Sequence, residues 1–134
     1  MPISPRIVST LACLAIACTM VRGEDLEVLC NPENFDVNPF YPFTVAFLDQ
    51  VVDCTWKSED SSCSINETYK EGSLWGHGGC SQNLKGPTDC EYCTGTAKEE
   101  LYKRCDTRVK GAHIRLAGCS LRYETYGFIA DPPF

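Results

Sequence analysis

The sequence predicts a small α+β domain that is stapled by disulfide bonds. Stretches with strand-like and helix-like patterns are interspersed, and the connections between them are too short for repeated parallel crossovers, which favours α+β over α/β. Ten cysteines occur in 134 residues, and the eight that follow the N-terminal leader form an even set, as expected of a disulfide framework. Residues 24–134 suffice for a single domain whose hydrophobic core alone would be marginal.

The N-terminus has the pattern of a secretory signal peptide, residues 1–23. Arg6 precedes an apolar run over residues 7–20, and a charged stretch follows the expected cleavage point. The run is about six residues short of the roughly 20 that a membrane-spanning helix needs, so we expect no membrane anchor. Cys13 and Cys18 would leave with the peptide and take no part in the disulfide framework.

The charge of the mature chain argues against a nucleic-acid partner. Removal of the signal peptide takes away two arginines and no acid, which leaves ten basic and 18 acidic residues and a net charge of −8. Such a surface should repel phosphate backbones. We therefore expect a secreted, extracellular protein that binds no nucleic acid.

The first half of the mature chain predicts one strand and one helix. Residues 26–30 are read as a short strand, and residues 31–42, with three prolines and several turn formers, as a loop. Over residues 43–54 the polar side chains cover a narrow arc and apolar ones fill the rest, which predicts a mostly buried helix.

A polar segment and a glycine-rich strand follow the first helix. Residues 57–73 are rich in serine and glutamate, so we expect an exposed connection there. Asn66 begins an Asn-Glu-Thr sequon for N-glycosylation. Residues 74–80 are read as a short strand whose three glycines predict close approach of another backbone or a bulge.

The second half predicts another helix and more strand. Thr88 and Glu91 have capping-box spacing, and cysteine and apolar residues then recur on one helical face, which predicts a helix over residues 89–104. Residues 112–128 alternate apolar and polar side chains around Gly118, which fits two antiparallel strands or one long bent strand. Outward-facing pairs at i, i+4 are expected on this helix: Glu99 with Lys103, and Glu100 with Arg104.

The order of cysteines and flanking residues resembles a known family. The pattern is Cys80, Cys90-x₂-Cys93, the second helix, then Cys105-x₅-Gly111-Ala112-His113-Ile114-Arg115-Leu116-x₂-Cys119-x-Leu121-Arg122-Tyr123-Glu124-x-Tyr126-x-Phe128. It resembles the ginkbilobin-2-like domain, the plant salt-stress-response/antifungal family, also found in cysteine-rich repeat secretory proteins. The resemblance covers essentially all of residues 24–134. It implies an antiparallel sheet packed on two helices.

The resemblance also implies a disulfide pairing and a compartment. Three bridges carry over from the family, and the two cysteines left over are paired with each other. The expected bridges are Cys30–Cys105, Cys80–Cys90, Cys93–Cys119 and Cys54–Cys63. The implied location is the plant apoplast.

The sugar-binding members imply a ligand site for a mannose-type glycan or a fungal cell-wall sugar. They hold the sugar with an asparagine, an arginine and a glutamate, and the matching positions here carry Asn31, His113 and Glu124. A carboxylate accepts hydrogen bonds from two vicinal hydroxyls, an amide both donates and accepts, and a cation donates to a ring or hydroxyl oxygen. Arg115 would share a strand face with His113 and could supply the missing cation. If His113 is the cation, binding should strengthen as the pH falls toward 5.5.

The expected function is therefore a lectin-like antifungal or defence module, neither an enzyme nor a metal or cofactor protein. One alternative is an apoplastic protein-interaction module that uses the sheet face or the aromatic side chains of Trp75, Tyr123 and Tyr126. A remote alternative is a small secreted ribonuclease with His77 and His113 as acid and base, which the net charge disfavours. The two histidines alone do not make a metal site.

Overall fold

We analysed a computed structural model, which describes residues 26–34, 40–70, 72–105 and 108–129. The predicted signal peptide and much of the predicted 31–42 loop lie outside these ranges. Within them, no helix is both long and apolar enough to span a membrane.

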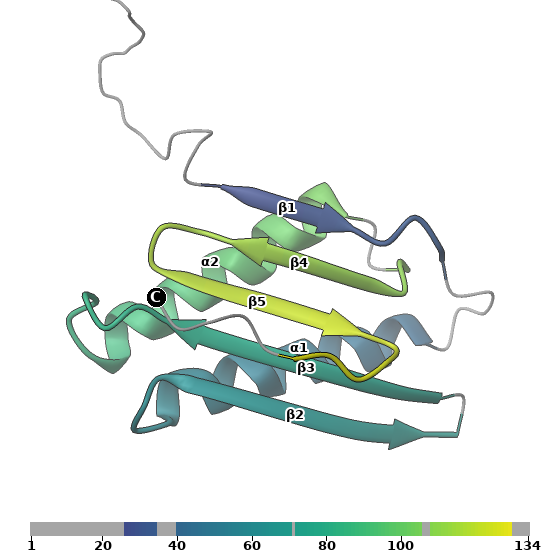
Figure 1. Ribbon diagram of the computed structural model, residues 1–134, viewed down its shortest axis with the longest axis horizontal. Helices are drawn as coiled ribbons and strands as arrows, with labels where there is room; N and C mark the ends of the chain where they lie inside the picture. The colour runs from purple at the N-terminus through teal and green to yellow at the C-terminus, as the bar shows by residue number, and fades with distance from the viewer. Residues whose placement is uncertain (1–25, 35–39, 71, 106–107, 130–134) are drawn as a thin grey trace, which may run out of the picture.

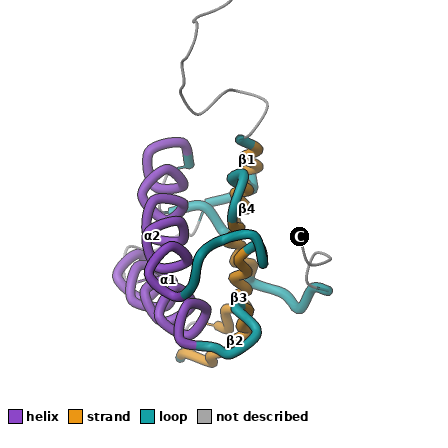
Figure 2. The backbone as a smooth tube through the Cα atoms, turned by 90° about the vertical axis from the view of Figure 1, so that its left-hand side faces the viewer, coloured by secondary structure: helices purple, strands orange, loops and turns teal. Residues whose placement is uncertain are grey.

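The described residues form one antiparallel sheet with two helices on one face (Figures 1 and 2). The strand order across the sheet is β1-β4-β5-β3-β2. The predicted α+β class, an antiparallel sheet packed on two helices, is confirmed. The elements in chain order are β1 (Glu27–Cys30), α1 (Phe40–Lys57), β2 (Ser62–Tyr69), β3 (Gly72–Cys80), α2 (Pro87–Arg104), β4 (Gly111–Arg115) and β5 (Cys119–Glu124).

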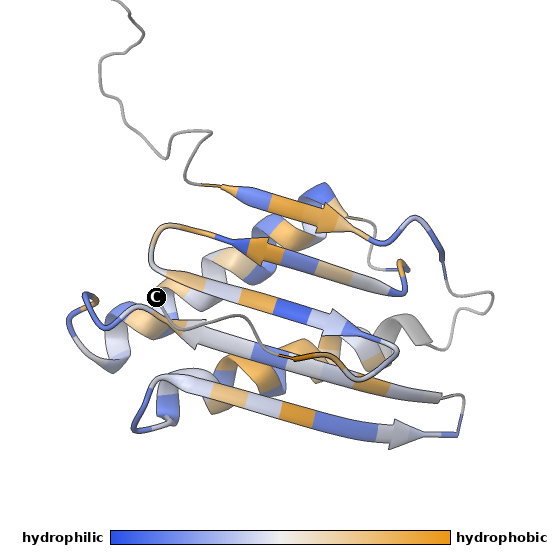
Figure 3. Ribbon diagram, viewed as in Figure 1, coloured by the Kyte–Doolittle hydropathy of each residue, from blue (hydrophilic) through white to orange (hydrophobic). Residues whose placement is uncertain are grey.

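The sheet has a buried face toward the helices and an open face on the other side. Alternate residues of a strand point to opposite faces, and the alternation of apolar and polar residues along β4 and β5 is visible in Figure 3. The buried set is apolar and packs on α1 and α2 to form the core. Its strand members are Leu74, Ala112, Ile114, Leu121 and Tyr123, and its main helix members are Phe47, Leu48, Val51, Ala97 and Leu101.

Two glycines of β3 let α1 pack closely on the sheet. A Cβ on Gly76 would lie 2.6 Å from Phe47 Cε2, and a Cβ on Gly78 would overlap the side chain of Thr55. The expected close approach at this strand is therefore present, but it is made by helix side chains rather than by another backbone.

The predicted exposed connection over residues 57–73 is wrong, because its middle part forms the edge strand β2. This strand pairs with β3 from Ser62 opposite Gly79 to Tyr69 opposite Gly72. Ile65 and Tyr69 lie partly buried against the core, while Ser64, Asn66 and Thr68, on the alternate positions, are exposed. Pairing with β3 outweighs the weak intrinsic strand preference of a polar segment.

Both helices begin earlier than the sequence pattern indicates. α1 starts at Phe40 and continues to Lys57. α2 starts at Pro87 after Gly86, and proline at the first helical position costs nothing because its missing N–H would have no helical acceptor. The predicted capping box does not form at this end: the carboxylate of Asp89 accepts a bond from the backbone N–H of Lys85 (3.1 Å).

The C-terminal region forms two antiparallel strands, which excludes a single bent strand. β4 and β5 are joined by a short turn in which the N–H of Leu116 donates to the carbonyl of Cys119 (2.8 Å). The chain leaves the sheet after Glu124, and the segment that follows crosses the open face, opposite the helices (Figure 2).

The eight cysteines among the described residues form four disulfides: the three pairs that the resemblance implies, and the expected pair of the two cysteines left over. Each bridge joins a helix, or the residue directly after one, to a strand, so together they tie both helices to the sheet. The pairs are Cys30–Cys105, Cys54–Cys63, Cys80–Cys90 and Cys93–Cys119.

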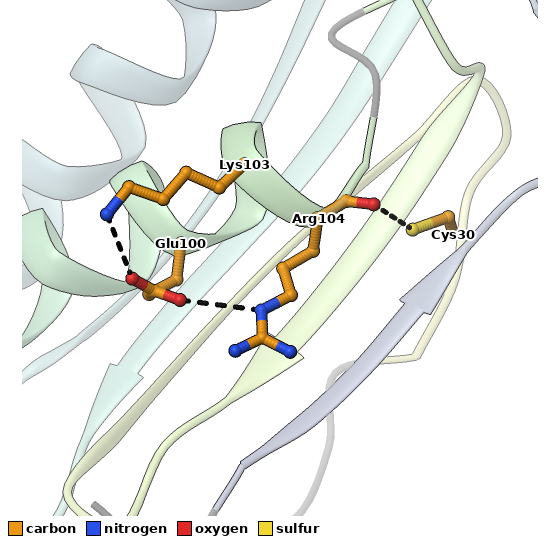
Figure 4. A network of polar contacts seen from close by, with 4 residues as sticks. All are labelled: Cys30, Glu100, Lys103 and Arg104. Carbon is orange, nitrogen blue, oxygen red and sulfur yellow. Dashed lines mark hydrogen bonds and ion pairs between the residues drawn. The ribbon is translucent and has the colours of Figure 1, made fainter.

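The end of α2 carries a small ion-pair cluster beside β1 (Figure 4). Arg104 Nε lies 3.5 Å from the carboxylate of Glu100, the expected pair, and Lys103 Nζ contacts the same carboxylate at 3.4 Å. The sulfur of Cys30 lies 3.7 Å from the carbonyl oxygen of Arg104, a contact without a proton because the sulfur is in a disulfide. Exposed pairs of this kind contribute little stability, so the Cys30 disulfide is the main tie.

Candidate functional site

A cavity of about 690 Å³ opens on the face of the sheet away from the helices. Residues of β1, β4 and β5 line it, together with the start of the segment after β5. All four residues singled out in the sequence lie in its wall: Asn31, His113, Arg115 and Glu124. The sheet register explains this, because Gly111 pairs with Glu124 and the N–H of Asn31 donates to the carbonyl of Gly111 (2.8 Å).

Asn31 lies just after β1, where a turn fixes its side chain. Its Oδ1 accepts a hydrogen bond from the backbone N–H of Glu33 (2.8 Å), the geometry of an Asx turn. Because Oδ1 serves the turn, the NH₂ group is the part of this side chain that can donate to a ligand.

Glu124 is the buried carboxylate of the cavity. It ends β5, and its carboxyl group lies over Gly111, where a Cβ would come within 2.8 Å of the glutamate Cδ. Its side chain is 9% exposed, and Oε2 accepts a bond from Arg122 Nε at 2.9 Å. A buried charge needs such a partner, so the two side chains form one unit.

Arg122 is the functional candidate that sequence reasoning missed. It lies directly opposite His113 on β4, and the ring of Phe128 stacks 4.1 Å from its guanidinium carbon. Partial burial opposes its charge, but contacts with Glu124 and Tyr126 outweigh burial and raise the pKa of Arg122. It is therefore a permanent cation.

A signal for Arg122 was present in the sequence. It precedes Glu124 by two residues on a predicted strand, so both side chains must share a face.

Arg115 lies at the other end of the cavity from Glu124. It pairs with Glu27 of β1, four residues along β4 from Gly111, which is roughly 13 Å at the rise of a strand. Glu124 lies in the Gly111 row, so Arg122 is the arginine next to the carboxylate.

The remaining singled-out residues divide between core and open face. Tyr123 is fully buried and its hydroxyl donates to the carbonyl of Val109 (2.8 Å), so it packs and offers no contact surface. Tyr126 is 51% exposed at the cavity wall. Trp75 lies partly buried beneath Gly127. His77 Nδ1 lies 2.8 Å from Ser64 Oγ.

No cluster of three or more histidine, cysteine, aspartate or glutamate side chains suited to a metal is found among the described residues. The chemistry of the cavity is that of hydrogen bonding and charge: two carboxylates (Glu27 and Glu124), two guanidiniums (Arg115 and Arg122), one amide and one imidazole surround a space open to solvent.

Replacing Gly111 with alanine should displace Glu124 and weaken the site while the fold persists. The added methyl group would overlap the carboxylate and lie 3.0 Å from the carbonyl oxygen of Tyr123. We expect affinity for the mannose-type sugar that the resemblance implies to fall at least about tenfold, equivalent to about 1.4 kcal/mol. Titration calorimetry measures it. Gly95→Ala is the matched control, because no neighbour lies within 4 Å of a Cβ there. Equal losses in the two variants would contradict this account.

Asn66 should carry a glycan when the chain passes through a eukaryotic secretory pathway. It lies in the middle of edge strand β2, exposed, with Nδ2 donating to the carbonyl of Leu74 (3.0 Å). The measurement is intact mass before and after glycosidase treatment, and Asn66→Gln should abolish the difference. Secreted material with only unmodified Asn66 would show the prediction to be wrong.

Comparison with known proteins gives one family and several relatives. The family model described as salt stress response/antifungal matches residues 29–126. Plasmodesmata-located protein 8 of Arabidopsis thaliana is 30% identical over 108 residues, which is 77% of this chain and 38% of that protein. The antimicrobial ginkbilobin-2-like protein of Castanea crenata is 38% identical over 56 residues, covering 42% of this chain and 22% of the relative.

Two solved structures share the fold. Both are tandem DUF26 ectodomains of Arabidopsis thaliana cysteine-rich receptor-like proteins. That of PDLP8 has a TM-score of 0.65 and 26% identity over 75% of this chain and 48% of its own. The PDLP5 ectodomain has a TM-score of 0.65 and 19% identity, and the match covers 76% of this chain and 50% of that chain. This chain thus spans about half the length of these neighbours.

Proposed function

Since this chain belongs to the salt stress response/antifungal family, we propose that it is an extracellular domain that binds a mannose-type sugar through the open-face cavity. Its relatives include ectodomains, and four disulfides suit an oxidising compartment. Secretion to the apoplast, a defence role and the absence of enzymatic activity are parts of the same proposal.

The observation that carries the proposal is the gathering of Asn31, Arg122 and Glu124 in one cavity. A carboxylate accepts hydrogen bonds from two vicinal hydroxyls, the amide donates, and the guanidinium has N–H groups beyond the one that Glu124 uses. These are the three chemical types with which the resemblance implies that a mannose-type ligand is held.

In this proposal Arg122 takes the place of the family arginine that His113 replaces. Because Arg122 and His113 are direct cross-strand partners, the positive charge moves one strand across the sheet and stays beside the cavity. Arg122 is charged at every physiological pH, so binding of a neutral sugar no longer depends on protonation of His113. We therefore expect mannose affinity to change by less than about twofold between pH 7.5 and 5.5.

A glycan array tests the proposal against a protein-interaction role. Selective retention of mannosides, lost in Arg122→Gln and kept in Arg115→Gln, supports it. Silence toward all glycans, with capture of a defined extracellular protein partner, would support the interaction module instead.

A further inference from the structure

The open face concentrates basic groups on an otherwise acidic protein. Residues 24–134 carry ten basic and 18 acidic residues, yet three basic side chains lie side by side across the middle of the sheet. Arg122 of β5 pairs with His77 of β3 on one side and with His113 of β4 on the other. The row spans two strand spacings, roughly 9.5 Å.

The other charges around this row come from β1, β4 and β5. β4 adds Arg115, β1 adds Glu27 and β5 adds Glu124. Glu124 is committed to Arg122 by the 2.9 Å pair, and Glu27 lies opposite Arg115 at the far end. Among uncharged neighbours, β2 presents Ser64 and the segment after β5 presents Tyr126. The positive charges of the two arginines and the negative charges of the two glutamates therefore cancel when the histidines are neutral.

Acidification makes the face cationic. Histidines ordinarily titrate near pH 6.5 and glutamates near 4.3, so a fall from pH 7.5 to 5.5 adds up to two positive charges and removes few negative ones. The Ser64 contact does not oppose this, because a serine oxygen accepts a bond from a protonated Nδ1 as readily as its hydroxyl donates to a neutral one.

We propose that this face binds sugars that carry a carboxylate, with an affinity that rises in acid. The inference rests on the proposed sugar site: the hydroxyls of a uronate lie on Glu124 and Asn31, and its carboxylate lies on the row of His77, Arg122 and His113. Glu124 accepts from Nε of Arg122 and Tyr126 also hydrogen-bonds the guanidinium, which still leaves terminal N–H groups that can donate to the carboxylate of a ligand.

A matched pair of ligands tests this: a short mannuronate oligomer and the mannose oligomer of equal length, titrated by calorimetry at pH 5.5 and 7.5. We expect the mannuronate affinity to rise roughly tenfold at the lower pH, the size of one charge-assisted contact, while the mannose affinity stays constant. High salt should weaken only the mannuronate.

Histidine variants supply the sharpest control, because the chain contains only two histidines. His77→Gln, which leaves the cavity wall unchanged, should reduce the pH dependence and keep mannose binding. Adding His113→Gln should remove the rest of the pH dependence. Lys103→Gln removes an exposed cation from α2, and it should change neither the pH dependence of mannuronate binding nor the affinity for mannose.

Three results would overturn the inference. If the protein binds mannose but its affinity for mannuronate does not rise in acid, the proposed function stands and the inference about carboxylate-bearing sugars is wrong. If the protein binds neither sugar, both the proposed function and this inference are wrong. Equal competition by inorganic phosphate, or RNA cleavage, would assign the row to phosphate.

Discussion

Replacing Glu124 with glutamine is expected to abolish detectable sugar binding, with a loss of at least about 100-fold, or about 2.7 kcal/mol. Glutamine keeps the shape of the glutamate side chain but loses its negative charge. The hydrogen bonds that two sugar hydroxyls would donate to the carboxylate therefore lose their charge assistance. The charge of Arg122 would also lose its buried partner at 2.9 Å. Titration calorimetry with mannose oligomers measures the effect.

Glu27 gives a matched control for this variant. It is a second glutamate in the wall of the same cavity, but it is exposed and lies at the opposite end, across from Arg115. Glu27→Gln should change mannose affinity by less than about twofold. Similar losses in the two variants would mean that the cavity as a whole attracts ligand by charge, without a site at Glu124.

Removing the long disulfide should have the largest effect on stability. Cys30 and Cys105 are 75 residues apart, and in the chain-entropy model that closure contributes about 4.5 kcal/mol, against about 2.6 kcal/mol for the 9-residue separation of Cys54 and Cys63. Paired alanine variants of each bridge, unfolded in urea, provide the comparison.

The long bridge should also affect the site. It holds β1, the edge strand that leads into Asn31, against the end of α2. We expect the Cys30→Ala, Cys105→Ala protein to lose sugar affinity even where it remains folded. The Cys54→Ala, Cys63→Ala protein should bind normally, since that bridge lies at the other edge of the sheet. A larger stability loss from the short bridge would contradict the assignment of roles.

Much of the fold could be predicted because the cysteines and helix patterns are local features. Two helices and the strands beside them follow from periodicity, and three of the bridges follow from the family resemblance that the cysteine pattern carries. β2 could not be predicted, since Ser62–Tyr69 is polar and becomes a strand only through its pairing with β3. Helix starts were misplaced because Pro87 begins α2 without a side-chain cap.

The site could be predicted in composition but not in arrangement. Asn31, His113, Arg115 and Glu124 do share one cavity, but which of them are neighbours depends on register. The turn after Arg115 sets His113 opposite Arg122, and a slip of one residue would send Arg122 into the core. The pairing of Arg122 with His113, on which the proposed move of the cation from β4 to β5 depends, can be identified only from the three-dimensional structure.

The most direct measurement of the central claim is nuclear magnetic resonance mapping of a mannose oligomer titrated into the isotope-labelled protein. Sugar binding at the open-face cavity predicts shifts concentrated at the backbone amides of Asn31, Gly111, His113, Arg122 and Glu124, saturating together. The amides of the hollow between the ends of the helices, around Trp56 and Leu84, should stay unchanged and serve as the internal control. Shifts confined to that hollow, or no shifts at saturating sugar, would contradict the account.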